Sequence, residues 1–122
     1  MLFRQILLDL LQSTHGSLGA IFLDSEGETV EVTTERPFDA GDHDLRVIGA
    51  YQGIFLSQLK RLCETLQAGT PRRFKVEFEK MNVLSCDLKE GYYLVLVVDD
   101  SANEGVAWRE LENCRGTIVE EL

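Results

Sequence analysis

The chain has 122 residues, 44% hydrophobic and 27% charged, so residues 1–122 suit one globular domain rather than a disordered segment. Asp and Glu number 21 against 12 Lys and Arg, and the net charge of −9 argues against nucleic acid or an anionic membrane as the main partner. No apolar run approaches the roughly 20 residues of a membrane span, and three widely spaced cysteines indicate buried, reduced thiols in a cytoplasmic protein.

The first third of the sequence predicts a helix followed by a β-hairpin. Apolar residues three and four positions apart over residues 2–12 indicate an amphipathic helix that ends near His15 and Gly16. Residues 18–23 are apolar on both faces, which is typical of a strand covered on both sides. Residues 29–34 alternate between apolar and polar side chains and therefore suit an edge strand.

A long helix is predicted to begin at Asp42 or Asp44 and to run to about Gln67, after which Gly69 and Pro71 act as stop signals. It carries two stripes at helical spacing: the first contains Ile48, Tyr51, Phe55, Leu59, Leu62 and Leu66, and the second contains Leu45, Gly49, Gln52, Gly53, Leu56 and Cys63. We expect the first stripe to dock the helix on a sheet. The second stripe is then left over, with two glycines where another backbone can approach closely.

Three strands follow without an intervening helix. Residues 73–79 alternate and suit an edge strand, whereas residues 92–98 are apolar on both faces, as in a central strand. Residues 82–88 lie between them and connect to the last strand through a turn that contains glycine. The inward side chains of the first of these strands are Phe74, Val76 and Phe78.

A last helix is expected over residues 102–122, with Ser101 as its N-cap. If the two doubly apolar strands lie at the centre and the alternating strands at the edges, hairpin connections give a five-stranded, mostly antiparallel sheet in the order 2-1-5-4-3. We therefore expect an α+β sandwich, with the long helix on one face of the sheet and the first and last helices on the other.

Three acids, Asp24, Glu26 and Glu28, surround Gly27 between the first two strands and raise the question of a metal site. An EF-hand loop needs a longer series of ligands before its glycine and a glutamate six residues after it, where this chain has Thr33. A tight turn needs Asp to cap its own backbone and Gly for positive φ. We therefore interpret the segment as a turn.

Other residues that often carry chemistry form no recognisable site. His15 and His43 are each predicted in a loop, without a second ligand at the spacing of a zinc site. No phosphate-binding or nucleophile motif occurs, so we expect no catalytic residue, no metal and no cofactor. The segment PRRFK contains Arg72 and Arg73, which form either a contact for a phosphate or an acidic partner, or only the solvated start of a strand.

Together these segments resemble the Roadblock/dynein light chain family, and within it the short bacterial MglB-like proteins. The resemblance covers nearly the whole chain. It is carried by the hairpin GAIFLDSEGETVEV, the long helix DLRVIGAYQGIFLSQLKRLCETLQ, and the last strand and helix GYYLVLVVDDSANEGVAWRELE. An acidic, proline-containing loop from Glu35 to Asp44 departs from the family pattern.

The resemblance implies a dimer, either of two copies or with a paralogous Roadblock chain, in which the long helices pack together and the third strands pair. It assigns to this interface Gly49, Gln52, Gly53, Leu56, Phe74, Val76 and Phe78. It also implies a platform for a small Ras-like GTPase, with Arg72 and Arg73 as candidate contacts for that partner. The function it favours is a non-enzymatic adaptor or regulator, with a GTPase-activating effect on the partner as one form of that role.

Two other classes stay open. A ligand-sensing or signalling domain of the PAS or GAF kind needs a pocket, and a PAS-like chain has several short helices between its second and third strands rather than one long helix. An enzyme needs a nucleophile, metal or phosphate motif, which this sequence lacks.

Overall fold

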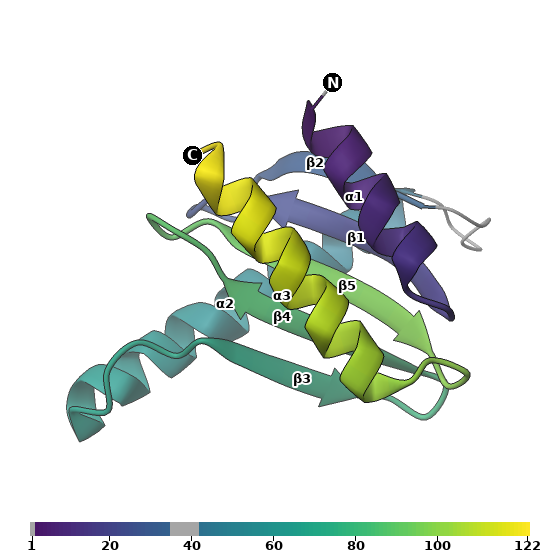
Figure 1. Cartoon of the computed structure of the whole chain (residues 1–122). Coiled ribbons are helices and arrows are strands. Elements are labelled where there is room, and N and C mark those ends of the chain that lie inside the picture. Colours follow the sequence, from purple (N-terminus) through teal and green to yellow (C-terminus); the bar gives the residue numbers. More distant parts are fainter. Residues whose placement is uncertain (1, 35–41) are drawn as a thin grey trace.

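The computed structural model describes residues 2–34 and 42–122, apart from the side chains of residues 42 and 43, and its elements follow the predicted order (Figure 1). They are α1 (Leu2–Ser13), β1 (Ser17–Leu23), β2 (Thr29–Thr33), α2 (Asp42–Leu66), β3 (Arg73–Glu77), β4 (Met81–Asp87), β5 (Tyr93–Asp99) and α3 (Glu104–Glu120). The acidic loop up to residue 41, the side chain of His43 and the predicted cap at Asp42 lie outside the described residues.

The five strands form one sheet in the order β2-β1-β5-β4-β3, and every neighbouring pair is antiparallel. The predicted strand order is confirmed. β1 and β5 lie side by side at the centre, since nearly all of their side chains are apolar and buried on both faces. β2 and β3 form the two edges.

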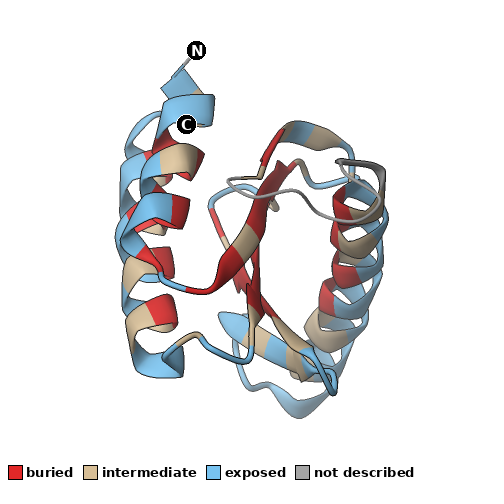
Figure 2. Ribbon diagram, turned by 90° about the vertical axis from the view of Figure 1, so that its right-hand side faces the viewer, coloured by how far each residue is buried: buried red, intermediate tan, exposed pale blue. Residues whose placement is uncertain are grey.

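Helices cover both faces of the sheet, as predicted: α1 and α3 lie together on one face and α2 lies on the other (Figure 2). Two hydrophobic clusters fill the space between the layers. The cluster under α1 and α3 includes the fully buried Leu7, Phe22 and Leu96. The cluster under α2, which we call the α2 cluster, includes Ile21 and Val95.

The ends of the helices differ from the prediction at one cap. The N-cap of α3 is Asn103, whose Oδ1 accepts a hydrogen bond of 3.0 Å from the backbone N–H of Val106. The predicted cap, Ser101, instead donates its backbone N–H and hydroxyl to Asp99 Oδ1 in the preceding turn. α2 ends at Leu66, one residue before the predicted end at about Gln67, and Gln67 itself takes a positive φ of 53°. The predicted stop signal Gly69 follows two residues later, with a φ of +85°.

Candidate interaction surface

The acidic segment between β1 and β2 is a turn, as predicted. Asp24 Oδ1 accepts hydrogen bonds from the backbone N–H groups of Glu26, at 2.9 Å, and Glu28, at 3.0 Å, and Gly27 has a φ of +84°. The carboxylate of Asp24 therefore serves as the hydrogen-bond acceptor for backbone N–H groups of its own turn. Among the side chains that the structure describes, those of residues 2–34 and 44–122, no group of three His, Cys, Asp or Glu residues is placed to hold a metal ion.

The part of α2 that the sequence assigned to a dimer interface packs instead on the sheet of its own chain. Gln52 and Leu56 are 3% and 4% exposed, so neither side chain is free to meet a second helix. Gly49 and Gly53 also face the sheet, where an added Cβ would collide with side chains of β1 and β5. The assignment of these four residues to the interface is therefore wrong.

The physical reason lies in how closely α2 approaches the sheet. A Cβ at Gly49 would lie 2.9 Å from Leu23 Cδ2, and a Cβ at Gly53 would lie 2.2 Å from the Tyr93 hydroxyl oxygen. That hydroxyl donates a hydrogen bond of 3.0 Å to the carbonyl oxygen of Gly49. The two glycines thus allow close packing of α2 on the sheet of the same chain. The buried side-chain amide of Gln52, on the same helix face, is hydrogen-bonded to the hydroxyl of Ser85.

The opposite face of α2 is apolar and exposed to solvent. It carries six large side chains, each between 39% and 64% exposed, which we call the α2 stripe: Val47, Tyr51, Ile54, Phe55, Leu62 and Leu66. Four of them belong to the stripe that the sequence analysis expected to be buried. Val47 and Ile54 were missed, although they lie four residues before and three residues after Tyr51, and this helical spacing was the signal that could have found them.

The apolar side chains of β3 lie on the face of the sheet that α2 covers. Phe74 and Val76 are only partly buried against the α2 cluster, because α2 itself lies mainly over β1, β2 and β5. Phe78 follows the end of β3 and is 52% exposed, so its prediction as an inward residue is wrong. The outer edge of β3 pairs with no other strand of the described chain.

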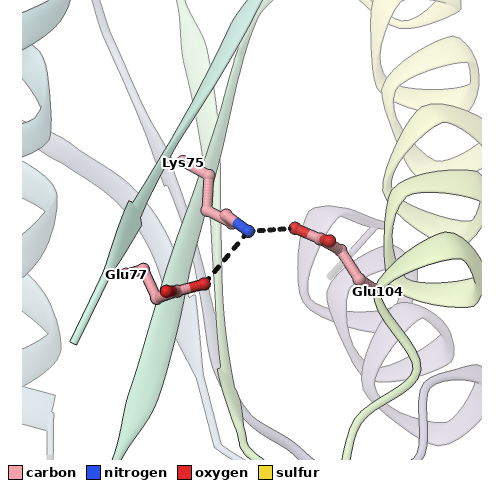
Figure 3. Close-up of polar contacts among 3 residues, drawn as sticks. All are labelled: Lys75, Glu77 and Glu104. Atoms are coloured by element: carbon pink, nitrogen blue, oxygen red, sulfur yellow. Dashed lines mark hydrogen bonds and ion pairs between the residues drawn. The ribbon is translucent and has the colours of Figure 1, made fainter. Parts of the chain in front are cut away.

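The other side of β3 is tied to α3 by charge. Lys75 Nζ bonds to the carboxylate of Glu104 at the start of α3 and lies 3.4 Å from Glu77 Oε1 (Figure 3). The hydrogen bond with Glu104 raises the pKa of Lys75, and the same bond lowers the pKa of Glu104. The charged residues of β3 therefore face α3, which leaves the apolar ones on the side of α2.

Arg72 and Arg73 stand at the start of β3, beside a depression between the α2–β3 connection and α3. The guanidinium carbon of Arg73 lies 4.4 Å from the centroid of the Trp108 ring on α3, a cation–π contact. Arg72 makes no ion pair with any residue that the structure describes. Arg115 of α3 lines the same depression, although no pattern in the sequence had marked this residue.

The buried thiols are poor nucleophiles. Burial raises the pKa of Cys86 and that of Cys114 to about 12. Both thiols therefore stay protonated at neutral pH, and a protonated thiol neither attacks a substrate nor binds a metal well. In the part of the chain that the structure describes, no helix has the length and apolar character to cross a membrane.

No protein-family model and no curated protein sequence matches the chain. Solved structures do match it. Gliding protein MglB from Thermus thermophilus has a TM-score of 0.85 at 18% identity, over 97% of this chain and 86% of that one. A Roadblock/LC7 domain from Streptomyces avermitilis has a TM-score of 0.80 at 18% identity, over 93% and 92%. An MglB with a tetrameric arrangement has a TM-score of 0.83 at 17% identity, over 97% and 85%.

The chain therefore has the fold of the Roadblock/LC7 class, an α+β sandwich with strand order 2-1-5-4-3. Within that class it is similar to MglB over nearly its whole length. The fold implied by the sequence resemblance is confirmed. At these identities the likeness concerns the fold, so function has to be argued from the surface of this chain.

Proposed function

We propose that this chain is a dimeric, non-enzymatic adaptor or regulator of a small Ras-like GTPase. The observation that carries the proposal is the α2 stripe, a row of large apolar side chains on the helix face turned away from the sheet. Soluble monomers rarely expose a contiguous apolar surface of this kind, so it marks a protein interface. The similarity to MglB and Roadblock/LC7 structures supports a role in assembly.

A second copy of the chain is the partner that we propose for the α2 stripe. In a two-fold dimer the same patch meets itself, so two antiparallel α2 helices bury both stripes at once. A tetrameric arrangement of a solved MglB supports self-association of this fold. A paralogous Roadblock chain with its own apolar helix face is the heterodimeric alternative.

Pairing of β3 with its equivalent in the second copy completes the proposed interface. An edge strand with open N–H and C=O groups invites pairing unless charge or a covering element blocks it. Phe74, Val76 and Phe78 keep their place in the proposed interface, because all three are at least partly exposed. On α2 the proposed contacts change from the buried glycine face to the α2 stripe.

Light scattering of the purified chain at micromolar concentration tests the dimer. We expect a mass of about twice 13.8 kDa. The double variant Tyr51→Glu/Ile54→Glu should return the mass to that of one chain, because it places charges in the centre of the apolar contact. Ser57→Glu, which adds a charge at an exposed position of the same helix outside the stripe, is the matched control. A wild-type chain that stays monomeric would overturn the interface.

The GTPase partner rests on the family that the sequence resembles, and Arg72 and Arg73 are its proposed contacts. An arginine supplied in trans can accelerate GTP hydrolysis by roughly 10³ to 10⁵. Arg73, however, is stacked on Trp108, which favours a docking contact over an arginine inserted into the partner's active site. Single-turnover hydrolysis by the GTPase, with wild type and with Arg72→Ala/Arg73→Ala, separates the two roles. Binding and stimulation should fall together; loss of stimulation with intact binding would establish a catalytic arginine.

The chain itself is proposed to bind no nucleotide. Phosphate sites use consecutive backbone N–H groups at a glycine-rich loop or helix start, usually with a lysine. Here Asp99 and Asp100 precede α3 and would repel a phosphate. Calorimetry with GTP and ATP should give no heat of binding, and micromolar affinity for either would indicate an enzyme or a nucleotide switch. The three free cysteines fit the cytoplasmic setting that we propose.

A further inference from the structure

The depression beside Arg72 has a cationic lining on an acidic protein. It measures about 950 Å³ and lies between residues 68–72, the end of β4 and the middle of α3. Its charged residues are Arg72, Arg73, Arg115, Asp87 and Glu112. Three positive against two negative side chains leave one positive charge in excess, while the chain as a whole carries −9.

The two carboxylates of the depression already have cationic neighbours. Asp87 Oδ1 lies 3.2 Å from Lys60 Nζ, and Glu112 Oε1 lies 3.7 Å from an Arg115 nitrogen. Arg115 is also anchored, since its Nε donates a hydrogen bond of 2.8 Å to the backbone carbonyl of Asp87. A guanidinium held in this way loses little conformational entropy when it binds a ligand.

Backbone donors add to the cationic side chains. The N–H groups of Gly69 and Thr70 donate no hydrogen bond within the described chain, and both residues line the depression. Arg72 lies next to them without an ion pair among the described residues. The depression is thus lined by two residues whose N–H groups have no partner in the described chain and by an excess of positive charge, two features that favour binding of an anion.

We propose that this depression binds a carboxylate of an acidic protein segment, with Arg72 and Arg115 as its principal donors. An excess of one positive charge matches the single negative charge of a carboxylate better than the double charge of a phosphate dianion. The planar guanidinium groups suit the two oxygens of a carboxylate. The inference rests on the proposed function in one respect, which is that the surface around Arg72 and Arg73 faces a partner protein.

Fluorescence anisotropy with a short, labelled glutamate-rich peptide and its glutamine counterpart tests this site on the purified full-length chain. We expect the glutamate peptide to bind at least about tenfold more tightly. Arg72→Gln should weaken it by roughly fivefold or more. Arg46→Gln, the same charge change at an exposed position on the first half of α2, is the matched control and should have less than about a twofold effect. Equal binding of both peptides, or equal losses in both variants, would overturn the site.

Backbone amide NMR locates the contact without relying on a variant. Addition of the glutamate peptide should shift the signals of Gly69, Thr70 and Arg115, and inorganic phosphate at the same concentration should shift them less. Larger shifts elsewhere, or stronger binding of phosphate, would overturn the assignment to a carboxylate segment. Because no GTPase is present, failure here with intact GTPase binding contradicts this inference alone, whereas loss of GTPase binding with intact peptide binding contradicts the proposed function alone.

Discussion

Gln52 Nε2 on α2 donates a hydrogen bond of 2.8 Å to Ser85 Oγ on β4, and the two residues are only 3% and 1% exposed. The two residues are 33 positions apart in the sequence, and in the structure they lie beside the apolar α2 cluster. A rotation or shift of α2 along the sheet would leave both polar groups buried without a partner. The bond therefore fixes which face of α2 meets the sheet, and with it which face stays exposed.

Removing one partner of the Gln52–Ser85 hydrogen bond should lower the free energy of unfolding more than replacing both partners by apolar side chains. Gln52→Ala leaves the Ser85 hydroxyl without its partner and opens a cavity, so we expect a loss of about 1–3 kcal/mol in the free energy of unfolding. The double variant Gln52→Leu/Ser85→Ala should lose less free energy of unfolding than the sum of the losses of Gln52→Leu and Ser85→Ala alone. Urea unfolding of the four chains of this double-mutant cycle measures the coupling. Additive losses would show that the bond does not position α2.

Alanine should have opposite effects at two helical glycines. At Gly53 the new Cβ would lie 2.2 Å from the Tyr93 hydroxyl oxygen, so Gly53→Ala should lower the free energy of unfolding by about 1–3 kcal/mol through overpacking. At Gly116 on α3 an added Cβ would have no described atom within 4 Å apart from its chain neighbours and the nearby backbone of its own helix. Gly116→Ala should therefore raise the free energy of unfolding by about 0.5–1 kcal/mol through helix propensity. Thermal unfolding checks both. A stabilised Gly53→Ala would contradict the close packing of α2 on β5.

Stability should fall at alkaline pH partly through Tyr93. Burial, with a smaller effect of the charge of Asp24, raises the pKa of Tyr93 to about 12 from its ordinary value of 10. The folded chain therefore holds this proton more tightly than the unfolded chain. The resulting stabilisation is fully present below pH 10 and is lost as the pH rises from 10 to 12, on the order of 2 kcal/mol.

Tyr93→Phe isolates that contribution. The variant should lose about 0.5–1.5 kcal/mol at pH 7, because the hydrogen bond to the Gly49 carbonyl is removed, and its stability should fall less steeply than that of wild type above pH 10. Urea unfolding at several pH values measures both. Tyr92→Phe, on the opposite face of the sheet, is the control for loss of a hydroxyl at pH 7. Parallel pH profiles for Tyr93→Phe and wild type would contradict the prediction.

The three thiols should differ in reactivity. Cys63 is partly exposed on α2, whereas Cys86 and Cys114 are buried with pKa values raised to about 12. At pH 8 roughly one in 10⁴ of the buried thiols is ionised. A thiol reagent at pH 8 should therefore modify Cys63 well before the others, and all three together in guanidinium chloride. Rapid modification of all three in the folded chain would contradict this burial.

Local patterns in the sequence determined the elements, the sheet and the turn. The doubly apolar segments at residues 18–23 and 92–98 identified the central strands, because only a strand covered on both sides has no polar face. The alternation over residues 73–79 identified an edge strand by the same reasoning. Asp24 and Gly27 identified the turn because capping and positive φ depend on residues close in sequence.

The tertiary structure alone decided which face of α2 is buried. Counting large apolar residues favoured the face with Tyr51 and Phe55, but close approach to the sheet required the small residues at Gly49 and Gly53. The contacts that settle the matter join residues 33 and 44 positions apart, Gln52 with Ser85 and Gly49 with Tyr93. Shape and polar matching between such distant residues leave no trace in helical periodicity, so only the folded chain shows which face of α2 is exposed.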